Sequence, residues 1–218
     1  MLLLKGLLNL KMPYTVRLSI FCVSCILVGL LLLFMFLYGP VKRYLYKKYT
    51  VRMYYNKVRR VVLDNDFYLV NSFANKTASQ EPFHIDHIVI GDKFIYCIRD
   101  RYYDGAIAAK ENDPSWIFYK GKKSTYIKNP MQVNRIRVDR MSLMSGIDSK
   151  LFISIVLINN DCMITRLENS FSDNYIVSLK KFPSLIAQLE SSDVPILNPH
   201  SIAIAAKDFS ELNLNGKI

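Results

Sequence analysis

The chain has 218 residues, of which 51% are hydrophobic, and a formal net charge of +11 at pH 7. This length suits one domain with an appendage, and the positive charge favours an anionic partner, either phospholipid head groups or nucleic acid. The four cysteines show no spacing typical of a zinc site or a disulfide framework, so we expect reduced, buried thiols: Cys22, Cys25, Cys97 and Cys162.

Residues 18–38 form an apolar segment without a charged residue. A helix needs roughly 20 residues to cross the hydrocarbon core of a bilayer, and within lipid it satisfies its own backbone hydrogen bonds. Gly39 and Pro40 end the run. A cleaved signal peptide and a buried core helix are the alternatives. The length of the run, and the lack of a small-residue cleavage site after it, favour a transmembrane helix.

Basic residues flank this segment unequally. The short N-terminal flank, residues 1–17, has three: Lys5, Lys11 and Arg17. Residues 39–63 have no acidic residue and many cations: Lys42, Arg43, Lys47, Lys48, Arg52, Lys57, Arg59 and Arg60. The more positive flank generally stays in the cytoplasm, so we predict a single-pass protein of the cell membrane with a cytoplasmic C-terminal domain. Tyrosines alternate with these cations, so this basic juxtamembrane segment is expected to contact anionic lipid head groups and to run as a helix into the domain.

Residues 64–218 are predicted to form one α/β domain with closing C-terminal helices. Alternating or continuously apolar runs predict strands at 67–70, 83–90, 93–99, 106–109, 115–119, 151–158 and 175–179. Residues 71–82 are polar and predict a loop. One helix should begin at Asn129 and Pro130, end near Gly146 and use four apolar positions: Met131, Ile136, Leu143 and Met144. Two further helices are expected at 183–190 and 199–212.

Three short motifs lie within this domain: Ile85-Asp86-His87-Ile88, Ile98-Arg99-Asp100-Arg101 and Asn129-Pro130-Met131-Gln132. They resemble the core motifs of the nuclease-related domain (NERD) family, part of the restriction-endonuclease-like group. Members usually show an Asp before an apolar strand, Glu-x-Lys at the end of the next strand and a Gln that opens a helix. The resemblance covers about residues 51–179. It implies a mixed sheet flanked by helices, here preceded by one transmembrane helix, and an ancestral role in nucleic-acid processing.

By this resemblance, four residues take the site positions of the family: Asp86 the Asp, Arg99 the Glu, Arg101 the Lys and Gln132 the Gln. In the family, carboxylates on neighbouring strand ends hold a divalent metal that activates water. Arg99 replaces one of these anions with a permanent cation, which leaves Asp86 as the metal ligand at these positions. A salt bridge between Asp86 and Arg99 would lie where the metal would sit. We therefore favour a degenerate site, and expect Mg²⁺ or Mn²⁺ only if the site is catalytic.

Several other residues have both a functional and a structural interpretation. The candidate nucleic-acid contacts, to DNA or RNA phosphates, are Arg99, Arg101, Arg137 and Arg140. Arginines on the predicted helix also suit a solvated helix face. We interpret His84 and His87 as ordinary strand histidines on the face opposite Asp86, and Trp116 as a core aromatic residue.

Three functions remain open. The first is a membrane-anchored, NERD-like protein that associates with nucleic acid but has lost catalysis. The second is an active metal-dependent nuclease with relocated ligands, Asp86 with Asp104. The third is a non-enzymatic membrane interaction or scaffold protein. No small-molecule substrate is evident, because the sequence has no Gly-rich phosphate loop, no Gly-x-Ser-x-Gly and no HExxH motif.

Overall fold

The computed structural model describes residues 13–77, 80–110, 112–165 and 173–216. The chain divides into two compact units, Met1–Tyr49 and Thr50–Ile218, and helix α2 (Tyr14–Asp64) contributes to both. The predicted continuation of the basic segment as a helix is therefore confirmed. The N-terminal flank up to residue 12, and the side chains of Lys42, Arg43, Lys47 and Lys48, lie outside the described residues.

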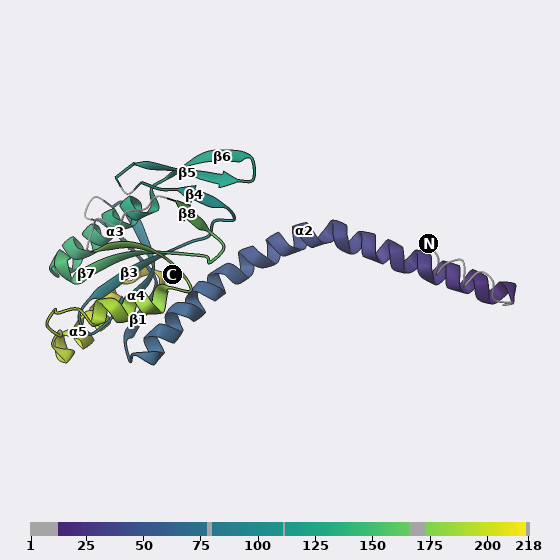
Figure 1. Cartoon of the computed structure of the whole chain (residues 1–218). Helices are drawn as coiled ribbons and strands as arrows, with labels where there is room; N and C mark the ends of the chain where they lie inside the picture. Colours follow the sequence, from purple (N-terminus) through teal and green to yellow (C-terminus); the bar gives the residue numbers. More distant parts are fainter. Residues whose placement is uncertain (1–12, 78–79, 111, 166–172, 217–218) are drawn as a thin grey trace. The chain divides into compact units, whose positions relative to one another are not determined.

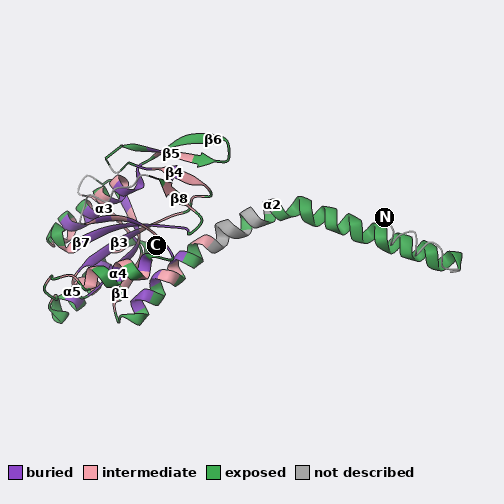
Figure 2. Ribbon diagram, in the orientation of Figure 1, coloured by how far each residue is buried: buried purple, intermediate pink, exposed green. Residues whose placement is uncertain are grey.

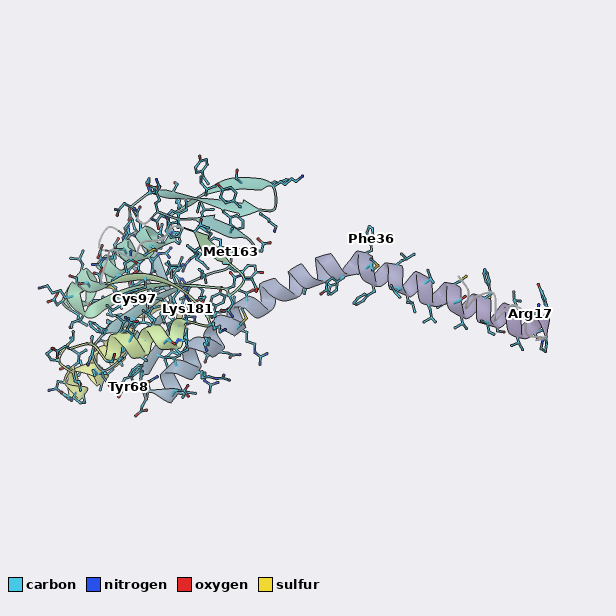
Figure 3. The ribbon with its side chains drawn as sticks, in the orientation of Figure 1. Arg17, Phe36, Tyr68, Cys97, Met163 and Lys181 are labelled. Carbon is cyan, nitrogen blue, oxygen red and sulfur yellow. The ribbon has the colours of Figure 1, made fainter. Side chains whose placement is uncertain are left out.

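The first part of α2, Tyr14–Tyr38, is long and apolar enough to cross a membrane, with a mean hydropathy of 3.0. Its side chains are exposed along the whole length, and Figure 3 shows Phe36 and its neighbours pointing away from the helix on several sides. An apolar surface of this extent is rare on a soluble protein and is typical of a lipid-facing helix. The predicted segment 18–38 lies within this helix, which begins earlier, at Tyr14.

The second unit is built on a five-stranded mixed sheet with the order β1-β2-β3-β7-β9. β1 (Tyr68–Lys76), β2 (Pro82–Ile90) and β3 (Ile95–Arg101) are antiparallel neighbours. β7 (Phe152–Ile158) and β9 (Asn174–Ser178) continue the sheet parallel to β3. Every side chain of β7 is buried, as its continuous apolar run predicts for a strand covered on both faces.

Helices cover both faces of this sheet (Figure 1). The last turns of α2 and helix α4 (Phe182–Glu190) pack on one face, where Tyr54, Val58 and Phe182 share a cluster with β2, β3 and β7. Helices α3 (Pro130–Ser145) and α5 (Pro199–Leu212) pack on the other face. Figure 2 shows the central strands as the most buried part of the chain. The predicted α/β architecture, a mixed sheet flanked by helices, is confirmed.

A second, smaller mixed sheet was not predicted. It has four strands in the order β6-β5-β4-β8: β4 (Ala106–Ala108), β5 (Ser115–Lys120), β6 (Lys123–Lys128) and β8 (Met163–Thr165). Trp116 of β5 is buried in its core beside Ile107 and Met131, which confirms the structural interpretation of this tryptophan. Two short 3₁₀ helices, Ser149–Leu151 and Leu214–Gly216, complete the described elements.

Helix α3 begins and ends where the sequence predicts, but the residues that it buries differ from the predicted ones. The side chain of Asn129 accepts from the backbone N–H groups of Met131 and Gln132, and Gly146 ends the helix at a φ of 69°. Ile136 and Leu143 are exposed by 54% and 85%, contrary to prediction. The buried positions are Pro130, Met131, Asn134, Val138, Met141 and Ser142. Apart from the adjacent pairs 130/131 and 141/142, they are three to four residues apart, which follows the helical repeat.

The polar stretch at 71–82, predicted as a loop, is mostly strand. β1 runs on to Lys76 because its backbone pairs with β2 from Asn71 opposite His87 to Lys76 opposite Pro82, with Ser72 as the one position of this stretch outside the pairing. Phe73 is fully buried within this extension. Backbone pairing and one buried aromatic side chain therefore prevail over the weak strand preference of the surrounding polar residues.

Candidate functional site

Asp86 and Arg99 lie side by side on β2 and β3. The antiparallel register of these strands, with His87 opposite Ile98, brings the two side chains to the same face. Nη1 of Arg99 donates to Oδ1 of Asp86 at 3.0 Å. The other carboxylate oxygen, Oδ2, accepts from the backbone N–H of Asp100 at 2.9 Å. The ion pair expected between Asp86 and Arg99 is confirmed, and both oxygens of the carboxylate are engaged.

His84 belongs to the same cluster. Its Nδ1 lies 2.8 Å from Nη1 of Arg99, and because a guanidinium only donates, Nδ1 must accept. Burial lowers the pKa of His84 below its ordinary value; Asp86 acts in the opposite sense, and Arg99 and Arg137 add to the lowering. The 3.3 Å approach of Nδ1 to Asp86 is therefore a contact of a neutral ring.

The predicted place of His84, opposite Asp86, is wrong. His84 lies two positions before Asp86, and strand alternation puts such positions on the same face. The predicted place of His87 is right: this side chain lies on the other face, buried against α2. The two-residue period of a strand, counted from Asp86, places His84 on the face of Asp86.

Arg137 adds a further cation from α3. Its pKa is lowered to about 10 by burial and then by Arg99 and Arg101, although Asp86 acts in the opposite sense. Arg101 follows Arg99 by two residues and shares its face, with Nη1 donating to the carbonyl of Asp100 at 3.2 Å. Three guanidinium groups thus lie near one another, and of these three only that of Arg99 pairs with Asp86 among the described residues.

Two nitrogen atoms of this arginine cluster (Arg99, Arg101 and Arg137) are buried without a hydrogen-bond partner among the described residues. They are Nε of Arg99 and Nη1 of Arg137. An unpaired buried donor is costly, and more so when it carries charge, because the group has lost its water. Both donors have the chemistry to bind an anionic oxygen.

The remaining predicted site residues have partners elsewhere. Nη2 of Arg140 lies 2.6 Å from Oε2 of Glu81. Nε2 of Gln132 donates to the carbonyl of Asn112 at 3.2 Å. Asp104 pairs with Lys120. No contact among the described residues joins Gln132, Arg140 or Asp104 to Asp86.

A polar network that the sequence did not predict lies on the opposite face of β2 and β3. His87 is 5% exposed, with Nε2 3.0 Å from Oδ2 of Asp100 and Nδ1 2.7 Å from Oδ1 of Asn71. Burial raises the pKa of Asp100, and the hydrogen bond from His87 opposes that shift. The hydroxyl of Tyr54 donates to the carbonyl of Arg101 at 2.7 Å. This network joins α2 and β1 to the parts of β2 and β3 that carry Asp86 and Arg99.

The residues of the site do not fit a divalent metal. Such an ion needs several oxygen or nitrogen ligands on one side of a cavity. Within the part of the chain that the structure describes, no three His, Cys, Asp or Glu side chains are placed to hold one. Asp86 is bound to Arg99, and Asp100 faces away toward His87. The cation at this site is the guanidinium of Arg99.

The family described as "Nuclease-related domain" (NERD) matches residues 48–159, slightly more than half of the chain. The matched range contains β1 to β7, α3 and all four residues that take the site positions of the family. No curated protein and no solved structure shows significant similarity to the chain.

Proposed function

The chain belongs to the nuclease-related domain family, and on that premise we propose that it is a membrane-anchored protein that binds nucleic acid without cleaving it. Phosphate groups of DNA or RNA are the ligands proposed for the arginine cluster. The helix Tyr14–Tyr38 is the proposed anchor, with the domain on the cytoplasmic side and the basic segment 39–63 against anionic head groups.

The ion pair between Arg99 and Asp86 carries the proposal that catalysis is lost. Metal-dependent cleavage needs an ion that lowers the pKa of a bound water and holds the reacting phosphate. A guanidinium stabilises phosphate charge, but it has no vacant orbital with which to bind and acidify water. The carboxylate that would anchor a metal is instead neutralised by the Nη1 donor at 3.0 Å.

The unpaired donors support a retained affinity for phosphate. Nε of Arg99 and Nη1 of Arg137 are buried without partners among the described residues, and Arg101 adds a third charge on the same face. Phosphate oxygens accept strong, charge-assisted hydrogen bonds from guanidinium groups. Because the cations are permanent, binding by this cluster should need no metal and should weaken with salt.

A binding experiment tests this function. The full chain in neutral nanodiscs is titrated into labelled single- and double-stranded DNA and RNA, in EDTA or in Mg²⁺, at several salt concentrations. We expect binding in EDTA, and Mg²⁺ should not strengthen it. Arg137→Gln should weaken it and reduce the slope of log K against log salt by about one. The matched control is Arg135→Gln on the same helix, because Arg135 already pairs with Asp139 and Asp173.

Two results would contradict the proposal in different ways. Metal-dependent cleavage that Asp86→Ala abolishes would establish an active nuclease with relocated ligands. Binding that is absent, or that Arg137→Gln and Arg135→Gln reduce equally, would leave a non-enzymatic scaffold as the function of this domain.

A further inference from the structure

Strands β5 and β6 form a hairpin with two unlike faces (Figure 1). The strands are joined by Gly121 and Lys122, and the φ of +59° at Gly121 is one that glycine adopts without strain. Trp116, Phe118 and Ile127 lie on the inner face and pack into the core of the small sheet. This face fixes the hairpin on the domain.

The outer face of the hairpin is uncovered. Ile117 lies directly opposite Tyr126, and Tyr119 is opposite Ser124. Tyr126 is exposed by 76% and Tyr119 by 41%, and Figure 2 shows most of β6 as exposed. Tyr126 and, in part, Tyr119 are therefore exposed on the same face of the hairpin.

The same hairpin is strongly cationic. Residues 115–128 contain four lysines and no acidic residue. Lys120 pairs with Asp104, whereas no ion pair joins Lys122, Lys123 or Lys128 to another described residue. These lysines lie at the tip and at the far end of β6, so positive charge borders the tyrosines at both ends.

We propose that the hairpin face, which combines the outer face of this hairpin (Tyr119, Tyr126 and Lys128) with the lysines of its tip (Lys122 and Lys123), contacts the anionic head groups of a lipid bilayer. Tyrosine rings favour the boundary between head groups and water, and lysine is attracted to anionic lipid. Lysines on an edge strand also hinder unwanted strand pairing, but that role does not call for paired exposed tyrosines.

Two observations favour lipid over nucleic acid as the occupant. The chain carries a helix apolar enough to cross a membrane, which would keep head groups at a high effective concentration around the domain. The cations of the hairpin face are all lysines, whose flexible point charges suit mobile head groups, whereas the arginine cluster offers the planar donors that suit fixed phosphates. The hairpin face thus supplies a second membrane contact, separate from the anchor.

Lysine labelling of the full chain tests the proposal. The chain is reconstituted in nanodiscs of phosphatidylcholine alone, or of phosphatidylcholine and phosphatidylserine in equal amounts, and treated with an amine-reactive ester. Mass spectrometry then reports the labelling rate of each lysine. We expect labelling of Lys122, Lys123 and Lys128 to fall several-fold in the anionic discs and to recover in high salt. Lys207, whose side chain is 75% exposed on α5, is the matched control and should not change.

A second measurement, fluorescence quenching, follows position 126. Tyr126→Trp should be quenched by brominated lipid in anionic nanodiscs, and Lys122→Glu with Lys123→Glu should abolish that quenching. Tyr68→Trp, at a tyrosine of β1 that is 47% exposed, should show no quenching beyond that of the native Trp116. Equal labelling of the hairpin lysines in both discs would overturn the proposal. Protection that appears only when DNA or RNA is added would overturn it too, and would assign the hairpin face to nucleic acid.

Discussion

Nη1 of Arg99 lies 3.0 Å from Oδ1 of Asp86, and it also lies 2.8 Å from Nδ1 of His84. One guanidinium nitrogen thus contacts the carboxylate and the imidazole that would otherwise be the nearest ligands for a metal. The charge of Arg99 is permanent, and 16% of its side chain is exposed, against 22% for Asp86. The pair is shielded enough from water that removing either member should change the free energy of unfolding measurably.

Asp86→Asn should lower the free energy of unfolding. The variant leaves the buried guanidinium of Arg99 without its counter-charge, beside Arg101 and Arg137, and we expect a loss of about 1–3 kcal/mol. Urea unfolding in micelles, followed by the fluorescence of the buried Trp116, measures it. Asp104→Asn is the control, since its exposed pair with Lys120 should contribute less than about 0.5 kcal/mol. Equal losses would contradict the importance of the Asp86–Arg99 pair.

Restoring the family motif should create a metal site. The double variant Arg99→Glu, Arg101→Lys places two carboxylates side by side on β2 and β3, where they repel until a cation binds. The variant should unfold at a lower temperature than the natural chain in EDTA. Mn²⁺ should then stabilise it, by about 2.7 kcal/mol at a hundredfold excess over Kd.

The natural chain should show no such dependence on Mn²⁺, because Arg99 already holds Asp86. Adding Asp86→Asn to the double variant removes one of the two carboxylates and should abolish the stabilisation. Stabilisation that survives this third change would mean that Mn²⁺ binds elsewhere, and the assignment of the site would fail.

The lowered pKa of His84 predicts how the stability of the domain changes with pH. The pKa of His84 is lowered in the folded state, so the unfolded chain binds this proton more readily. The contribution of His84 to stability should be complete above about pH 6.5 and should be lost as the pH falls toward the lowered folded pKa. Because 38% of the side chain is exposed, the effect should be small.

His84→Gln isolates this effect, since a glutamine oxygen can still accept from Arg99. As the pH falls, the natural chain should lose more of its unfolding free energy than the variant does. Asp100 and Glu190, whose pKa values are raised by burial, act in the opposite sense but are common to both proteins. A histidine NMR titration that placed His84 above its ordinary pKa would show that Asp86 outweighs the arginines.

The ion pair could be predicted from the sequence because it depends on local rules. Two apolar runs separated by Gly91 and Asp92 predict neighbouring antiparallel strands, and the motif positions then bring Asp86 beside Arg99. The ends of α3 follow equally local chemistry, with a capping side chain at Asn129 and a left-handed glycine at Gly146.

The rest of the fold depends on contacts that local patterns do not encode. β6 has five exposed residues out of six and no apolar alternation, so only its pairing with β5 makes it a strand. The network of Asn71, His87 and Asp100 joins three strands, and each residue by itself is an ordinary polar position. Arg137 could be named as a candidate, but its approach to the arginine cluster depends on how α3 packs on the sheet.

Asn134 provides the last prediction, because it ties α3 to the strands beneath the site. It is fully buried, and its Nδ2 lies 3.0 Å from both the carbonyl of Cys97 on β3 and Oγ of Ser154 on β7. Asn134→Ala removes these donors and leaves a cavity, so we expect a loss of about 2–3 kcal/mol in unfolding free energy. Asn160→Ala is the control, since Asn160 is exposed and its side chain accepts from the backbone N–H of Lys180. The first variant should also weaken nucleic-acid binding, because α3 carries Arg137, and the control should not. Unchanged binding by a folded Asn134→Ala protein would show that the position of α3 is fixed without this residue.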